Sequence, residues 1–128
     1  MPARVVFEYA VIRIVPRVER EEFLNAGVIL FCRARRFLNA HIALDAPRLL
    51  AFAPQLDLAT VEEQLSYLPL ICQGGASAGP IGILPLPERF RWLVAPRSTI
   101  VQPSPVHAGL CHDPQHELER LAAAMVSG

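Results

Sequence analysis

Polar side chains that could take part in binding or catalysis are concentrated near the end of the chain, between Ala95 and His116. Within Ala95–Gly109, three prolines alternate with groups that can donate, accept or carry charge: Arg97, Ser98, Thr99, Gln102, Ser104 and His107. Proline fixes the backbone torsion φ, which stiffens the segment that carries these groups. Binding residues are often found on loops that a rigid scaffold positions. Ala95–Gly109 is therefore the first place to look for function.

The residue types in this segment suit the binding of an anionic ligand. Arg97 can hold a carboxylate or a phosphate in a bidentate manner, and Ser98 adds a hydroxyl donor. His107 can titrate near neutral pH. Gln102 and Arg13, the latter in the first predicted strand, complete the candidate ligand-binding set. The alternative is structural: these groups satisfy backbone carbonyls at a strand end and hold the C-terminal helix. No residue is predicted to be catalytic.

A second group of potential ligands combines cysteine and histidine: His107, Cys111, His112 and His116. Zinc is bound tetrahedrally by such side chains. However, adjacent residues such as Cys111 and His112 point apart on a regular backbone, and a helix is predicted to begin between His112 and His116. Cys111 with a neighbouring histidine could also form a nucleophile and base, but no third group to orient the base is evident. We therefore expect neither a metal nor a cofactor.

Two further motifs invite a phosphate-binding interpretation. Gly74–Gly79 is glycine-rich, but a phosphate loop needs a Lys-Ser/Thr pair that opens a helix, and here Pro80 follows. Gly74–Gly79 is predicted to be a linker. The Arg33-Ala34-Arg35-Arg36 turn could contact nucleic-acid phosphates. The alternative is a solvated hairpin tip whose charges discourage pairing with other strands.

Composition limits the classes of partner. The chain has 128 residues, of which 52% are hydrophobic and 19% charged, so it can fill the core of one domain spanning residues 1–128. Its twelve arginines balance its acidic residues, and a net charge of zero argues against a dedicated nucleic-acid binder. No apolar run reaches the length of a membrane span. Three widely separated cysteines without a signal peptide favour a reducing cytoplasm.

Hydrophobic patterns predict an α+β fold, with an antiparallel sheet of about four strands and helices packed mainly on one face. Val5–Val15 is apolar on both faces, which indicates a central strand covered on both sides. The other strands are predicted at Val28–Cys32, Phe37–Leu44 and Ser98–Gln102, and Glu19–Leu24 is predicted to be a turn or short helix ended by Asn25–Gly27.

Helix starts are indicated by capping residues. Asp45 can cap a short helix through Phe52, Asp57 or Thr60 a longer one, and Asp113 a C-terminal helix that has Pro114 at its first position. Another short helix is predicted at Pro87–Val94. Pro69 is expected to kink or end the longer helix because it removes a backbone hydrogen bond.

Several long motifs resemble the bacterial family named domain of unknown function 3037. They are Phe7–Pro16, Glu22–Leu30, Arg91–Ser98 and Ser104–Gly109, followed by Asp113-Pro114. The resemblance implies a small stand-alone bacterial protein, and some relatives lie near kinase genes. It supplies no activity, cofactor or catalytic residue.

The leading functional hypothesis is a non-catalytic accessory module that binds a protein partner, for which the resemblance suggests a kinase or toxin-like enzyme. Two alternatives stay open: a small-ligand or phosphoryl-handling enzyme that uses Arg97, Ser98 and His107, and a nucleic-acid module that uses the Arg33–Arg36 turn. The lack of a complete catalytic constellation favours the accessory role. The sequence leaves the oligomeric state open.

Overall fold

The structure is a computed structural model that describes residues 3–127. Five strands and four α-helices make up its framework. In chain order they are β1 (Val5–Ile14), β2 (Leu24–Cys32), β3 (Phe37–Ile42), α1 (Ala46–Phe52), α2 (Leu58–Gln73), α3 (Leu86–Leu93), β4 (Val101–Pro103), β5 (His107–Cys111) and α4 (Pro114–Ala122). Short helical turns lie at Val18–Arg20, Ala76–Ala78, Pro80–Ile83 and Ala123–Ser127. The predicted α+β class is confirmed.

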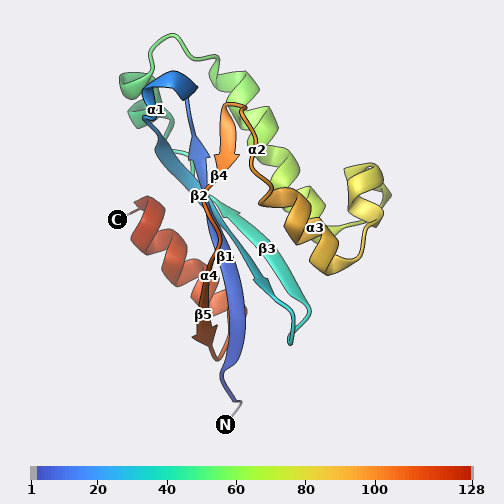
Figure 1. The fold of residues 1–128 in the computed structure, drawn as a ribbon. Helices are drawn as coiled ribbons and strands as arrows, with labels where there is room; N and C mark the ends of the chain where they lie inside the picture. Colours follow the sequence, from blue (N-terminus) through green and yellow to red (C-terminus); the bar gives the residue numbers. More distant parts are fainter. Residues whose placement is uncertain (1–2, 128) are drawn as a thin grey trace.

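The five strands form one antiparallel sheet with β1 at its centre (Figure 1). The order is β3-β2-β1-β4, and β5 also pairs with β1. β4 pairs with the C-terminal half of β1, whereas β5 pairs with its N-terminal half. β4 and β5 are thus both neighbours of β1, and the segment between them passes from one half of β1 to the other.

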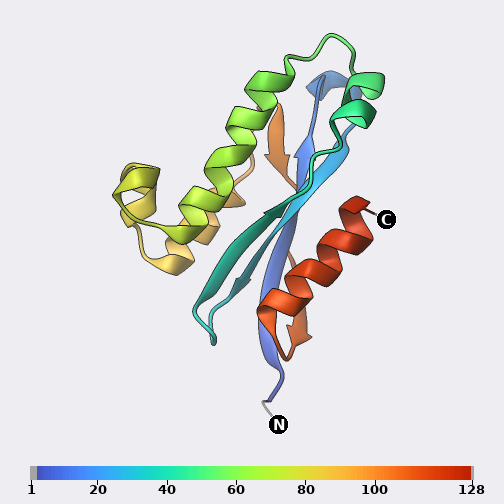
Figure 2. The ribbon, with the colours of Figure 1, turned by 180° about the vertical axis from the view of Figure 1, so that it is seen from behind.

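Helices lie on both sides of this sheet, mainly on one of them. Figures 1 and 2 show α2 and α3 on one side and α4 on the other. The larger core lies under α1, α2 and α3 and includes Ile12, Ile29 and Leu65. The smaller core lies under α4 and includes Leu30 and Leu118. Each face of the sheet therefore contributes to a separate hydrophobic cluster.

Three aspartates cap helices as predicted. The side chain of Asp45 accepts a hydrogen bond from the Arg48 amide at the start of α1. Asp57 does the same for α2, where Thr60 also donates its hydroxyl to the Asp57 carboxylate at 2.8 Å. These hydrogen bonds lower the pKa of Asp57. Asp113 accepts from the Gln115 amide and begins α4. Each cap satisfies amides that have no partner within the helix.

Two predicted boundaries are wrong. β2 begins at Leu24, because a bulge in the β1–β2 register lets the chain pair from Leu24 onward instead of turning through Gly27. α2 continues through Pro69 to Gln73. Burial of Ile71 and Cys72 beyond the proline holds this last turn against the core. The packing of that turn therefore outweighs the single missing backbone hydrogen bond.

Within residues 3–127, no helix is both long and apolar enough to cross a membrane.

Candidate functional site

The polar segment Ala95–Gly109 completes the sheet. Its residues leave α3, pair with the C-terminal half of β1 as β4, cross over at Pro103-Ser104-Pro105 and pair with the N-terminal half of β1 as β5. The strand predicted at Ser98–Gln102 lies slightly later, at Val101–Pro103, and β5 was not predicted. Much of the segment is thus a pair of sheet strands.

Ser104 holds this crossing together. Its side chain is buried, with 3% of the residue exposed. The Val11 amide donates to Ser104 Oγ at 2.8 Å, and the Ser104 amide donates to the Val11 carbonyl at the same distance. The Ser104 hydroxyl in turn donates to the Pro105 carbonyl at 2.9 Å. A serine side chain therefore replaces a backbone acceptor where the pairing with β1 passes from β4 to β5.

Arg97 is engaged at the C-terminus of α3. Its Nη2 donates to the Trp92 carbonyl at 2.6 Å and to the Leu93 carbonyl at 3.4 Å, and its guanidinium lies 4.8 Å from the centre of the Trp92 ring. Partial burial lowers the pKa of Arg97. These carbonyls lack partners within the helix, and a cation is favourable at this end of the helix dipole. Arg97 thus binds backbone carbonyls, as in the structural alternative, but at the end of α3 and not at a strand end or on the C-terminal helix.

Arg89 caps α2 in the same way, although no sequence pattern singled it out. Its Nη1 donates to the carbonyls of Ile71 and Cys72 at 2.8 and 2.7 Å, and its Nε donates to the Leu84 carbonyl at 3.0 Å. The arginine lies in α3, so it fastens one helix to the end of another. Its signal in the sequence is weak because the donor and acceptors are 17 and 18 residues apart.

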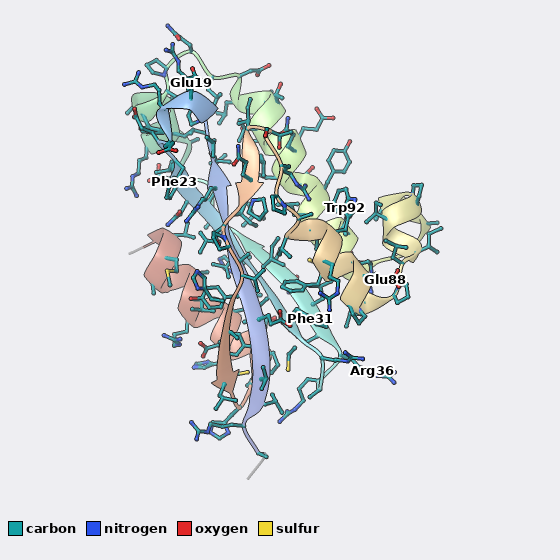
Figure 3. All side chains as sticks on the ribbon, viewed as in Figure 1. Glu19, Phe23, Phe31, Arg36, Glu88 and Trp92 are labelled. Atoms are coloured by element: carbon teal, nitrogen blue, oxygen red, sulfur yellow. The ribbon has the colours of Figure 1, made fainter. Side chains whose placement is uncertain are left out.

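Of the remaining predicted ligand-binding residues, Gln102 lines a small hollow together with Arg97. Ser98 is exposed, and Gln102 donates its side-chain amide to the Thr99 carbonyl at 2.7 Å. Arg13 lies directly opposite Gln102 in the β1–β4 pairing, and its guanidinium lies 4.1 Å from the Phe23 ring centre. Figure 3 shows Phe23 and Trp92 on separate parts of the molecule.

His107 is exposed in β5, where its ring lies 5.4 Å from that of Tyr9, its partner across the β1–β5 pairing. Tyr9 packs against the core under α4, whereas Arg97 is held at the end of α3 on the other side of the sheet. Arg97 and His107 are ten positions apart in the sequence, yet they lie on different faces of the sheet. The predicted ligand-binding set remains a prediction: Arg97 and Gln102 line one small hollow of about 10 Å³, and His107 lies on the other face of the sheet.

The cysteine and histidine cluster is likewise dispersed. Cys111 is buried in the core under α4, while His112 and His116 are exposed at the start of that helix. Burial raises the pKa of Cys111. Among the described residues, no group of three or more histidine, cysteine, aspartate or glutamate side chains could hold a metal ion.

One part of the sheet surface is uncovered on the α3 side, contrary to the expectation that β1 is covered along its whole length. Val6 pairs with Leu110 across the β1–β5 ladder, and Glu8 pairs with Ala108. Val6 is 60% exposed and Leu110 54%. The helices on this side cover β2, β3 and the C-terminal half of β1, but they stop short of β5. We call the surface formed by Val6, Glu8, Ala108 and Leu110 the open face.

A hollow of about 570 Å³ adjoins the open face. Phe31 lies in it, directly across from Glu8 in the β1–β2 pairing and stacked on Phe90 of α3 with ring centres 5.0 Å apart. Its other lining residues come from the β2–β3 turn and the start of α3: Arg33, Arg36, Leu86 and Pro87. Figure 3 shows Phe31 on the sheet, between α3 and the turn that carries Arg36.

Residues 9–126 match the family described as "Protein of unknown function (DUF3037)", and the chain therefore belongs to that family. No curated protein and no solved structure shows significant similarity to it.

Proposed function

We propose that this member of the DUF3037 family is a non-catalytic accessory module that binds a protein partner through the open face. The observation that carries the proposal is the exposed cross-strand pair of Val6 and Leu110. Scattered exposed apolar residues are normal on protein surfaces, whereas a contiguous apolar patch is typical of an interaction site. Here the patch lies on a regular sheet, and its Glu8 pairs with Phe31, which lines a neighbouring hollow together with Leu86 and Pro87.

The contacts around Ala95–Gly109 favour a binding module over an enzyme whose active site is formed by that segment. Arg97 already donates to helix-end carbonyls, and Ser104 already serves the β1 ladder. A phosphoryl-handling site needs its cation and its acid or base around one substrate position. Arg97 and His107 lie on different faces of the sheet and are engaged with different neighbours. The family resemblance suggests a kinase or toxin-like enzyme as the partner.

The experiment is quantitative affinity capture from native bacterial lysate with matched variants. Val6→Thr/Leu110→Thr removes apolar surface but keeps side chains that a sheet tolerates, since threonine pairs well across strands. Ile83→Thr is the control, because Ile83 is 74% exposed and lies in a turn outside the open face. Circular dichroism and melting curves verify that all three proteins fold alike.

We expect one protein to be retained stoichiometrically by the wild type and by Ile83→Thr, and to be lost with Val6→Thr/Leu110→Thr. Retention by all three proteins would place the contact elsewhere and remove the open face as the binding surface. Loss of a co-purifying nucleotide in an Arg97→Ala/His107→Ala variant would instead favour the enzyme alternative.

A further inference from the structure

Charge is unevenly distributed around the hollow. Arg33 and Arg36 line it, and Arg35 lies in the same turn. All three arginines are exposed. The ion pairs formed within residues 3–127 are Arg20–Glu22 and Arg120–Glu117, so no described carboxylate lies within 4.0 Å of the turn arginines. The turn therefore offers guanidinium groups that form no ion pair with the described carboxylates.

Arg36 adopts a conformation that its side chain does not favour. Its φ is +50°, in the left-handed region where glycine or asparagine is usual. The turn closes with a hydrogen bond from the Arg36 amide to the Arg33 carbonyl at 3.1 Å. A glycine would complete the same turn without strain, so turn geometry does not explain the arginine. The turn itself therefore does not require an arginine at this position.

The shape of the surface favours a helix as the occupant. Neighbouring strands are about 4.8 Å apart, so the open face on β5 and β1 and the hollow beside β2 span roughly 10 Å, the diameter of a helix. A strand added at the outer edge of β5 would extend the sheet without reaching the hollow. The opposite face is covered in the same manner by α4.

We propose that the partner docks an acidic amphipathic helix on the open face, with apolar side chains against Val6 and Leu110 and carboxylates paired with Arg33 and Arg36. This inference rests on the proposed function and names the chemistry of the partner. Arginine pairs with carboxylates in a bidentate geometry, and an apolar stripe flanked by charges is the usual pattern of a helix bound in a groove. Glu8 is the one carboxylate of the open face, so a basic or amide side chain of the helix faces it.

An acidic helix fits this surface better than a nucleic acid. The floor of the hollow is Phe31, which is itself buried against Phe90, and its wall is Leu86 and Pro87. Sequence-tolerant binding of single strands requires exposed aromatic rings on which bases stack, along a cationic groove. Here Phe31 is only 5% exposed, and the other apolar residues that line the hollow with the arginines are aliphatic.

The probe is an 18-residue fluorescent peptide designed as an amphipathic helix. It carries a leucine stripe, glutamates in its first two turns and one lysine in the middle of the helix. Two matched peptides replace the glutamates with glutamine or with lysine. Fluorescence anisotropy against the full-length protein measures the affinities at low and high salt, and a labelled single-stranded oligonucleotide is titrated in parallel.

We expect the glutamate peptide to bind at least 10-fold more tightly than the glutamine peptide, with the lysine peptide weakest. This preference should shrink in high salt and disappear in Arg33→Gln/Arg36→Gly. The single variant Arg36→Gly should weaken binding while its melting temperature stays unchanged or rises, which separates lost charge from lost folding.

Equal affinity for the glutamate and glutamine peptides would overturn the acidic partner, as would tighter binding of the oligonucleotide or no binding of any peptide. The Val6→Thr/Leu110→Thr variant separates the two proposals. If the peptides are equivalent but this variant loses both, the charge inference fails and the open face remains the binding surface. If this variant binds the glutamate peptide as well as the wild type, the open face itself is refuted.

Discussion

Ser104 shows how a single hydroxyl can connect two short strands to a long one. β4 and β5 pair with β1 in registers that differ by one residue, so they do not form a continuous strand beside it. Ser104 Oγ accepts from the Val11 amide at 2.8 Å, where a backbone carbonyl would normally be found. The polar residue that looked available for ligand chemistry thus supports the sheet.

Replacing Ser104 with alanine should destabilise the protein by about 1–3 kcal/mol, because the buried Val11 amide would lose its acceptor. Urea unfolding measures the free energy of unfolding. Ser98→Ala is the control, since Ser98 lies in the same segment with an exposed side chain. Faster hydrogen exchange at the Val11 amide should accompany the loss. Equal stability of the two variants would mean that the hydroxyl is dispensable to the crossing.

At the same scale, sequence reasoning identified the capping aspartates, whereas the ligand-binding set remains a prediction. A cap depends on amides two or three residues away, so Asp45, Asp57 and Asp113 could be recognised locally. The carbonyl partners of Arg97 are also close in sequence, but nothing in the pattern tells a helix-end contact from a ligand contact. Only the positions of Trp92 and Leu93 decide this.

At the scale of elements, α2 is held by packing despite an internal proline. Pro69 has no amide to bond the Leu65 carbonyl, and the helix continues for four more residues. Near the end of α2, the carbonyls of Ile71 and Cys72 accept hydrogen bonds from the guanidinium of Arg89, which lies in α3. The end of α2 is therefore fixed by its neighbours.

Pro69→Ala should stabilise the protein by about 1–3 kcal/mol, because it restores a backbone hydrogen bond in a helix interior. Thermal and urea unfolding measure the gain. Pro47→Ala is the matched control: Pro47 lies in the first turn of α1, where no intrahelical bond is missing. A loss of stability in Pro69→Ala would show that the proline ring, which lies beside Ile42 and Leu44, contributes more through packing than its missing bond costs.

Cys72 gives the same helix a pH-dependent stability. Burial raises the pKa of its thiol from 9.0 to about 12, with Arg89 opposing the shift. In the unfolded chain the thiol ionises at the lower pKa, so above pH 9 the unfolded state binds fewer protons than the native state. Stability should therefore fall with rising pH by up to about 1.4 kcal/mol per pH unit from this group, and should be unaffected well below pH 9.

Urea unfolding of the wild type and of Cys72→Ala between pH 7.5 and 10.5 isolates this effect, since the other titrating groups are shared. We expect a steeper decline for the wild type above pH 9. Parallel curves would show that the thiol ionises equally readily in the native and unfolded chains.

For the whole molecule, the sequence predicted the central strand and the fold class, but not which part of the sheet is uncovered. β5 pairs with the start of β1, and the paired residues Val5 and Cys111 lie near opposite ends of the sequence. No local sequence pattern predicts a pairing over this separation. Val6 lies in an apolar strand and was expected to be buried. Its exposure depends on where α3 begins and on the absence, among residues 3–127, of a helix over β5 on that face of the sheet. The open face is thus a property of the assembled sheet.

Site-specific photo-crosslinking in living cells tests the open face most directly. A photo-reactive amino acid replaces Val6 in one protein and Ile83 in the other, and mass spectrometry identifies the products. We expect Val6 to crosslink to one dominant protein, through an acidic helical segment, and Ile83 to crosslink to no such partner. The same products from both positions, or a specific partner captured through Ile83 alone, would contradict the assignment of the open face as the docking surface.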